Sequence, residues 1–493
     1  MNQDNKQFLA QQVIESISEW QIMHSVAFRQ ADNTARPVPF SIAPMTIERP
    51  IYEHLLAVTP LIAKLVSNVS EDHDFLQASL GDMAKADPFF GRLMELHQQA
   101  HGDATQRQHP ARQPLLLMRT DFMDDRAHGA KVIEFNGIAA GMAPFGQRAA
   151  QLHQYVKDQW SDIYHQWVED DSATPADNQG MEQLALGIAT AATKVQTHFA
   201  ELGERTVDVK PTFLMIVQKD EDNVYDQHLL EAALQQRGIR TVRRTFEQLS
   251  RQLSSGENQR LILDGVGAID SVYLRAGYQY ADYWAPDLNE DVCCHTLSQT
   301  RLFIEKHYVA MNATISQQLA TSKSMQMLLT MMPAQDYARW GLTLNEAKLV
   351  KSVLADMKPV SQESIEWFNR SANKQDWVLK NQGEGGGHCV FGEEISDTLA
   401  KLQPQEYDAW ALMQRLYPHE RETPTIAVRD GQQTRVDDLV SEIGLFTAHY
   451  QGEPVTEQNG YAGYLIRSKP ASENEGGIHS GQGILDSLVL IDK

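Results

Sequence analysis

The segment from about residue 211 to residue 275 alternates short apolar runs with helical patterns, and this alternation constrains the fold most. PTFLMIVQ (211–218) is typical of a short strand buried on both faces. Residues 226–237 have helical spacing, and strand-like runs return at TVRRT (241–245), LILD (261–264) and SVYLR (271–275). Strands that alternate with helices form βαβ units, so the pattern predicts a parallel sheet within an α/β module.

The chain on either side of this module has a different texture. Residues 5–32 and 51–100 are predicted to be helical, and LLLMR (115–119) and KVIEFN (131–136) are predicted strands. After residue 376, several of the runs WVLKN, TIAVRD, LVSEIGLFTAHY and AGYLIRS alternate apolar with polar residues, which is typical of an antiparallel sheet. We therefore predict an α+β body with an α/β insert, divided into residues 1–210, 211–345 and 346–493.

Size and charge exclude several classes of protein. A chain of 493 residues is too long for one ordinary core, and a formal net charge of −22 argues against a nucleic-acid-binding surface. The cysteines (Cys293, Cys294 and Cys389) form no CxxC pair, so neither a disulfide framework nor a structural zinc site is expected. We expect a cytoplasmic protein, because no apolar run could span a bilayer and the N-terminus lacks the features of a secretory signal.

The sharpest chemical signal is the run WVLKNQGEGGGHCVFGEE at residues 377–394. A strand-like stretch ends at Lys380, and Glu384 then lies within a cluster of glycines. Glycines let backbone amides approach phosphate oxygens, a lysine adds positive charge, and a carboxylate beside phosphates can bind Mg²⁺. This combination predicts a phosphate-binding loop, and the alternative is a flexible hairpin tip that binds nothing.

Two further strands carry paired polar residues. Glu134 and Asn136 alternate along one strand, so their side chains point to the same face and could share a metal ion with Glu384. Arg467 and Lys469 share a face in the same way ahead of a glycine-rich loop, which predicts recognition of a carboxylate or a phosphate. In both cases the alternative is a half-exposed strand whose polar residues face solvent.

Seven blocks of this sequence resemble those of eukaryotic-type glutathione synthetases. They are I-E-F-N (133–136), N-V-Y-D-Q (223–227), R-R-T-F-E (243–247), Y-L-R-A-G-Y (273–278), Q-L-A-T-S-K (318–323), K-N-Q-G-E-G-G-G-H-C-V-F-G-E-E (380–394) and L-I-R-S-K (465–469). The blocks stand in the family's order and cover the chain from about residue 115 to its end. The resemblance implies an ATP-grasp fold, with a mainly antiparallel body, a parallel-sheet substrate domain and a glycine-rich lid. It also implies a homodimer.

The resemblance further implies a set of site residues. ATP would be held by Lys323, Lys380, Glu384, Gly385, Gly386, Met413, Gln414, Arg415, Leu416, Glu442 and Lys469. The metal, Mg²⁺, would be held by Glu134, Asn136 and Glu384. The substrates would contact Arg119, Ala139, Gly141, Asn223, Gln227, Arg275, Tyr278, Arg467, Ile478 and His479, of which Arg119 and Arg467 would be catalytic.

The implied reaction is ATP-dependent ligation of γ-glutamylcysteine with glycine, through an acyl phosphate, to give glutathione. The chain departs from the family pattern near both substrates: Ala139-Ala140-Gly141 replaces Ser-x-Ser, Ala276 replaces an acidic residue, and Ile478-His479 replaces a smaller pair. These departures leave open a related ligase with another acceptor amino acid or γ-glutamyl donor. A nucleotide-binding protein without catalysis is the other alternative, and the retained Glu134, Asn136 and Glu384 argue against it.

Overall fold

One mixed sheet of 13 strands runs through the protein. The computed structural model describes residues 9–103, 105–205, 209–285, 295–383, 389–474, 476–478 and 482–492. Its α-helices are α1 (Gln11–Met23), α2 (Arg49–Ser70), α3 (His73–Ala86), α4 (Pro88–His101), α5 (Ala143–Gln159), α6 (Ser161–Trp167), α7 (Gly180–Glu201), α8 (Val224–Gln236), α9 (Phe246–Gln252), α10 (His295–Glu305), α11 (Ile315–Ala320), α12 (Lys323–Met331), α13 (Leu344–Val353), α14 (Gln362–Arg370) and α15 (Glu394–Lys401). The strands of the large sheet are β3 (Phe40–Ser41), β5 (Gln113–Asp125), β6 (Gly129–Asn136), β8 (Thr212–Ile216), β9 (Arg240–Arg244), β13 (Ser271–Leu274), β14 (Ala310–Asn312), β19 (Thr425–Arg429), β20 (Gln432–Val436), β21 (Leu439–Tyr450), β22 (Glu453–Pro454), β23 (Tyr461–Pro470) and β24 (Ile484–Asp486).

Strand β5 joins a parallel half of this sheet to an antiparallel half. The order is β20-β19-β3-β24-β23-β21-β5-β14-β13-β8-β9, with β6 paired to β5 and β22 to β21. On one side, β14, β13, β8 and β9 run parallel, and β14 pairs with β5 at Gln113 and Pro114. On the other side, β5, β21, β23 and β24 run antiparallel. The predicted parallel module is therefore continuous with the body rather than a separate sheet.

Successive residues of the central strands enter opposite cores. Leu116 and Met118 of β5 pack in the core that contains α2, α4 and α11, whereas Leu115 and Leu117 pack in the core that contains α5, α7 and α8. Strand β8 divides its side chains in the same way. Burial on both faces explains why these strands read as continuous apolar runs.

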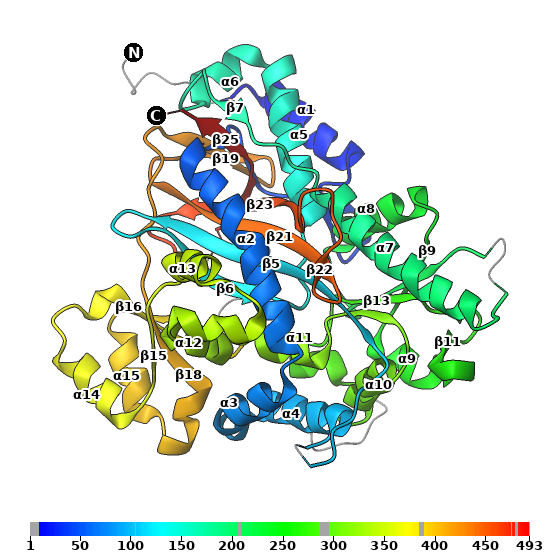
Figure 1. The fold of residues 1–493 in the computed structure, drawn as a ribbon. Helices are drawn as coiled ribbons and strands as arrows, with labels where there is room; N and C mark the ends of the chain where they lie inside the picture. Colours follow the sequence, from blue (N-terminus) through cyan, green and yellow to red (C-terminus); the bar gives the residue numbers. More distant parts are fainter. Residues whose placement is uncertain are drawn as a thin grey trace.

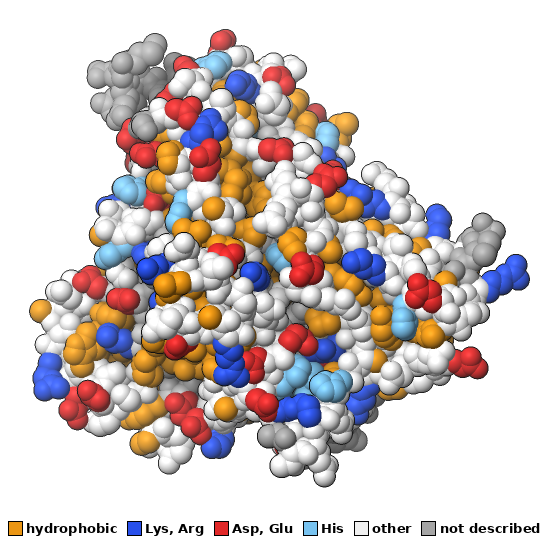
Figure 2. Space-filling model, viewed as in Figure 1, with side chains coloured by type: hydrophobic (Ala, Val, Ile, Leu, Met, Phe, Trp, Pro, Cys, Tyr) orange, Lys and Arg blue, Asp and Glu red, His pale blue; other side chains and the backbone are white. Residues whose placement is uncertain are grey.

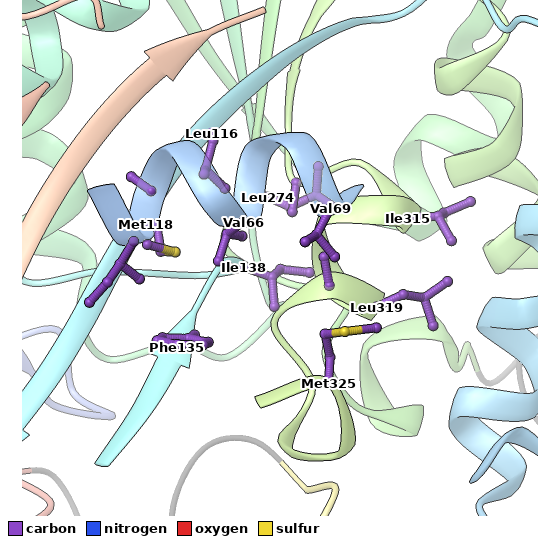
Figure 3. Close-up of a cluster of buried hydrophobic side chains, with 14 of the residues drawn as sticks. Val66, Val69, Leu116, Met118, Phe135, Ile138, Leu274, Ile315, Leu319 and Met325 are labelled. Carbon is purple, nitrogen blue, oxygen red and sulfur yellow. The ribbon is translucent and has the colours of Figure 1, made fainter. Parts of the chain in front are cut away.

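Helix α2 crosses one face of the large sheet (Figure 1). Its buried Val66 and Val69 lie in one cluster with Phe135 of β6 and with Leu319 and Met325 of α11 and α12 (Figure 3). Ser322 caps α12 by accepting a hydrogen bond from the Met325 amide at 3.2 Å. The core therefore fixes the first turn of α12 relative to β6.

A second sheet, antiparallel and four-stranded, forms the module drawn in yellow at the lower left of Figure 1. Its order is β15-β18-β16-β17, from β15 (Met357–Pro359), β18 (Trp410–Gln414), β16 (Trp377–Asn381) and β17 (Cys389–Phe391). This module has a small core of its own, to which α14 contributes Phe368 and α15 contributes Ile395. Met327 of α12 packs against Met357 and Met413, which connects this module to the body.

The remaining strands form three small sheets. These are β1 (Ala27–Arg29) with β2 (Ala35–Pro37), β10 (Leu253–Ser255) with β11 (Leu261–Leu263) and β12 (Gly267–Ala268), and β4 (Met45–Glu48) with β25 (Leu488–Ile491) and β7 (Thr174–Pro175). The assignment of LILD to the parallel sheet was wrong. This run is β11, in an antiparallel sheet, because its links to β10 and β12 are too short for a parallel crossover.

The prediction of one long N-terminal helix over residues 5–32 was also wrong, because the helix in the structure is shorter. Helix α1 ends at Met23, Ser25 takes a φ of 61°, and β1 follows as one strand of a hairpin. Residues 1–8 lie outside the described structure. Within the described ranges, no helix is both long and apolar enough to cross a membrane.

Candidate active site

A cavity of about 630 Å³ is lined by residues of both the large sheet and the four-stranded sheet. Its wall contains the predicted residues Arg119, Glu134, Asn136, Ala139, Gly141, Asn223, Arg275, Tyr278, Lys323, Lys380, Met413, Gln414, Arg415, Leu416, Glu442, Arg467, Lys469 and Ile478. Gln227 is not part of the wall; it is buried behind it and donates to Glu221 at 2.6 Å. Glu384, Gly385, Gly386 and His479 lie outside the described residues.

Asp121, a buried carboxylate of β5, holds the middle of this wall together. It accepts two hydrogen bonds from the Arg119 guanidinium, at 2.6 Å from Nε and 2.7 Å from Nη2. Arg467 donates to it from β23 at 3.0 Å, and Asn136 donates from β6 at 3.0 Å. Arg467 also pairs with Glu442 of β21. One buried anion therefore fixes two arginines that border the cavity.

Two lysines from different elements flank Glu134. Nζ of Lys323, the first residue of α12, lies 3.4 Å from Oε2 of Glu134. Lys380 reaches across from the four-stranded sheet and donates to the Ile133 carbonyl at 3.2 Å. Burial alone would raise the pKa of Glu134, but these lysines and Arg119 overcome it and lower that pKa to about 2. Glu134 is therefore ionised at neutral pH.

The residues on this face suit a magnesium ion. Glu134 presents a carboxylate to the cavity, and Asn136 engages its amide nitrogen with Asp121, which leaves its amide oxygen for another partner. Burial raises the pKa of Glu442, with Arg467 opposing this effect, and Glu442 lines the same cavity. Mg²⁺ prefers oxygen ligands of this kind, so the donor set fits that ion.

A second polar region lies around Arg275. Its guanidinium donates to Asp226 at 2.8 Å and to Glu221 at 3.2 Å. Gly141 has no room for a side chain, because a Cβ there would lie 2.5 Å from the Arg275 guanidinium. The buried Oδ1 of Asn223 has no hydrogen-bond partner among the described residues, which suits a donor on a ligand. This region combines cationic and anionic groups, as recognition of an amino-acid-like ligand requires.

The opposite end of the cavity is more apolar. Met413 of β18 is 2% exposed and packs with Met327 and Met357, with Leu416 at the edge of the cluster. The Arg415 guanidinium lies over the Phe391 ring at 5.4 Å. Apolar side chains with a guanidinium beside them can hold an aromatic ring.

The glycine-rich segment after β23 closes one side of the cavity. Lys469 donates to the Glu473 carbonyl at 2.7 Å, and Gly476 and Gly477 line the wall. Ile478 is 2% exposed and packs into the core that contains α5 and α7. Backbone amides and a lysine therefore border the cavity at this edge.

The sequence of this chain matches the family model of the eukaryotic glutathione synthase ATP-binding domain over residues 7–490. The chain belongs to this family. Among its curated relatives, it is similar to the chloroplastic glutathione synthetase of Solanum lycopersicum, with 29% identity over 92% of this chain and 78% of the relative. It is also similar to the glutathione synthetase of Homo sapiens, with 28% identity over 98% of this chain and 97% of the relative.

A solved structure with a similar fold is a glutathione synthetase-like effector from Globodera pallida. The TM-score is 0.69 at 18% identity, and the match covers 98% of each chain. At this identity the likeness concerns the fold alone. It confirms the prediction of a mixed α/β architecture of the glutathione synthetase type.

The site assignments from the sequence did not include three anionic groups, of which Glu221 lines the cavity and Asp121 and Asp226 lie behind it. Asp121 binds Arg119 and Arg467, and Asp226 and Glu221 bind Arg275. The Arg-Thr-Asp order on β5 places Arg119 and Asp121 on one face of the strand, and this signal could have identified the first pair. Asp226 lies inside the N-V-Y-D-Q block, but its pairing with Arg275, like that of Glu221, joins segments about 50 residues apart and left no local signal.

Proposed function

We propose that this chain is an ATP-dependent ligase that joins γ-glutamylcysteine to glycine and releases glutathione, ADP and phosphate. The observation that carries the proposal is the cavity shared by the two sheets, which gathers cationic side chains along a chain matched almost end to end by the family. The ATP-grasp mode, with nucleotide between two sheets, is part of the proposal. So is the division into residues 1–210, 211–345 and 346–493.

The reaction needs an activated carboxyl group, because a free carboxylate is a poor electrophile. A carboxylate oxygen of the γ-glutamyl peptide attacks the γ-phosphorus of ATP, the bond to the bridging oxygen breaks, and ADP leaves. The glycine nitrogen then attacks the acyl phosphate carbon, the C–O bond breaks, and phosphate departs with its electrons while the nitrogen loses a proton. No side-chain nucleophile is required, so the protein acts by positioning and charge neutralisation.

The nucleotide is assigned to the end that contains Lys323, Lys380 and Met413. The two lysines would contact phosphate oxygens, and Met413 to Leu416 would border the base with Glu442 nearby. Mg²⁺ on Glu134 and Asn136 would shield phosphate charge during transfer. Lys380 reaches Ile133 from the other sheet, which supports a nucleotide held between them.

The peptide is assigned to the end that contains Arg275, Asn223 and Tyr278. Glu221 and Asp226 would orient Arg275, and the free Oδ1 of Asn223 would accept from the peptide. We also assign Ala139 and Gly141 to the peptide-binding end. Gln227 would act there indirectly, because it donates a hydrogen bond to Glu221.

The reacting carboxyl group is assigned to the space between these ends, beside Arg119 and Arg467. Both guanidiniums are anchored on Asp121, so they need no rearrangement as negative charge develops. Lys469 and the backbone at Ile478 and His479 would close over the product and exclude water, which would otherwise hydrolyse the acyl phosphate. The homodimer and the cytoplasmic location stay predictions.

Two features favour a ligase with a different donor or acceptor as the second candidate. Arg275 occupies the space beside Gly141 where a side chain would stand, and Ile478 adds bulk near the predicted acceptor end. A coupled ADP-release assay distinguishes the candidates. Each amino acid of an acceptor panel is tested with γ-glutamylcysteine and with other γ-glutamyl donors, in the presence of ATP and Mg²⁺.

Glycine should give the highest kcat/KM in this panel, and Lys380→Ala should raise the KM for ATP. Turnover with another amine but not with glycine would select the second candidate. Full activity of Lys380→Ala would contradict the nucleotide assignment, and ATP binding with no turnover on any substrate would contradict ligase activity.

A further inference from the structure

Three histidines outside the cavity converge where α3 begins and α4 ends. His73 is the first residue of α3, and His97 and His101 lie one turn apart on α4. The two α4 histidines are 0% exposed, whereas 12% of the His73 side chain is exposed. Pale blue histidine side chains are visible on the surface in this part of Figure 2, but the fully buried His97 and His101 are not among them. The proposed ligase reaction uses none of these three residues.

Their ring nitrogens lie close enough to share one ion. One ligand atom from each histidine falls within 4.8 Å of the others, and His97 Nε2 is 3.3 Å from His73 Nδ1. Zn–N bonds of about 2.1 Å in a tetrahedron separate two ligand nitrogens by roughly 3.4 Å. The His73 and His101 rings stack at 3.6 Å between centroids, so a tilt of these rings would bring their lone pairs onto one point.

A metal-free arrangement leaves one nitrogen unsatisfied. Hydrogen bonds can run from the Gln77 amide to His97 and on to His73, whose Nε2 lies 3.8 Å from Glu71. This series of hydrogen bonds does not include Nδ1 of His101, which is buried and has no hydrogen-bond partner within the described part of the protein. Its other ring nitrogen, Nε2, faces Ser316 Oγ at 3.3 Å. A metal ion would satisfy the remaining nitrogen, since a buried polar atom is rarely left unpaired.

The outer contacts resemble those that support metal-bound histidines. Glu71 stands on the outer side of His73 and Ser316 on the outer side of His101, so each can accept the proton of the nitrogen that does not bind metal. His97 would need the Gln77 amide to present its oxygen, a half-turn that gives up its 3.0 Å contact with the Gly102 carbonyl. This half-turn, the tilt of the stacked rings and the loss of the His97–His73 hydrogen bond are the local costs of binding.

The electrostatic surroundings tolerate a cation. Arg112 is paired with Glu71 at 3.0 Å and lies 3.5 Å from Glu305, and Arg107 is paired with Asp74. Both nearby guanidiniums are therefore neutralised by carboxylates.

We propose that His73, His97 and His101 bind a borderline divalent transition metal, Zn²⁺ or a similar ion, separate from the Mg²⁺ of the ligase site. Three nitrogen donors favour such an ion over Mg²⁺, which prefers oxygen. The metal fixes α3 to α4 and, through Ser316, to α11, the helix immediately before α12 and Lys323. The site uses three histidines and no cysteine, so counting cysteines in the sequence could not reveal it.

The test is a metal titration of the full chain. Chelator-treated protein in millimolar Mg²⁺ is titrated with Zn²⁺ by calorimetry and with Co²⁺ by visible absorption, which reports nitrogen coordination. We expect about one Zn²⁺ per chain and a rise of a few degrees in the unfolding temperature. His101→Gln and the more exposed His73→Gln should each weaken binding by about 10-fold or more and abolish the thermal shift.

His165→Gln is the matched control, because His165 is exposed and pairs with Asp171 at 2.7 Å. It should bind Zn²⁺ as the wild type does. The proposal fails if the wild type shows no saturable Zn²⁺ binding, or if His73→Gln and His101→Gln bind it like the wild type. Circular dichroism of the metal-free variants separates loss of the site from loss of the fold. Ligase activity in Mg²⁺ is recorded separately, so failure of either proposal can be recognised without the other.

Discussion

Replacing Asp121 with asparagine should disorder the centre of the proposed active site. Asp121 is 0% exposed and receives hydrogen bonds from Arg119, Arg467 and Asn136. Asparagine keeps one acceptor oxygen but loses the charge, and its amide nitrogen would face a guanidinium. Removing one partner of a buried ion pair costs about 3–5 kcal/mol, and the retained oxygen suggests the lower value, about 3 kcal/mol. Arg467 keeps Glu442, so Arg119 is the residue most affected.

We expect kcat/KM for ADP release to fall by about 10²-fold or more, as for other preorganised charged groups. Urea unfolding would give the change in the free energy of unfolding, and the coupled assay would give the rate. Asp437→Asn is a matched control, because Asp437 pairs with Arg435 two residues away at 2.8 Å on the exposed surface. Its activity should be unchanged. If Asp121→Asn kept kcat/KM within about twofold of the wild type, the anchoring role of Asp121 would be refuted.

Three other perturbations follow from the contacts described above. The pKa of Glu134 lies below its usual 4.5, at about 2, so its ionised form stabilises the fold above pH 4.5 and this contribution disappears as pH falls toward 2. Lys323→Met should raise that pKa, so the free energy of unfolding measured in urea should begin to fall at a higher pH. If its dependence on pH were unchanged, the pairing of Lys323 with Glu134 would be contradicted. Gly141→Ala would displace the Arg275 guanidinium and should raise the KM for the γ-glutamyl peptide by about 10-fold or more, with the KM for ATP as the unaffected control. Leu319→Ala removes a fully buried side chain and should lower the free energy of unfolding by about 2–5 kcal/mol, whereas a loss below about 1 kcal/mol would mean that this core is loosely packed.

Sequence periodicity predicted the strands of the site better than their arrangement. The predicted run WVLKN coincides with β16 and LVSEIGLFTAHY with β21, because both are apolar enough to specify a buried strand. The family and the ligase class were also predicted from ordered motifs, and the family match confirms them. LILD is a strand, as predicted, but it was assigned to the wrong sheet, because periodicity does not show how strands pair. The helix predicted at residues 5–32 was too long, because the chain reversal at Ser25 leaves little trace in periodicity.

Lys380, Glu384, Glu134 and Asn136 were singled out by their spacing within single segments, whereas Lys323, Met413 to Leu416 and Glu442 were implied only by the family resemblance. Spacing did not show that Lys380 and Glu134 border one cavity, since they belong to different sheets and Lys380 reaches the neighbouring Ile133 carbonyl across the cavity wall. The same holds for the histidines, where the i, i+4 pair is visible on α4 but His73 joins it from another helix.

The sequence by itself determined most of the strands and helices and which segments carry the groups predicted to bind phosphate and metal, because periodicity and motif spacing are local properties. The tertiary structure alone decided that β5 joins the parallel and antiparallel halves in one sheet. It also decided that Asp121 anchors arginines from two strands and that Arg275 fills the space beside Gly141. These contacts join residues far apart in the chain, and which distant side chains meet depends on how whole elements pack.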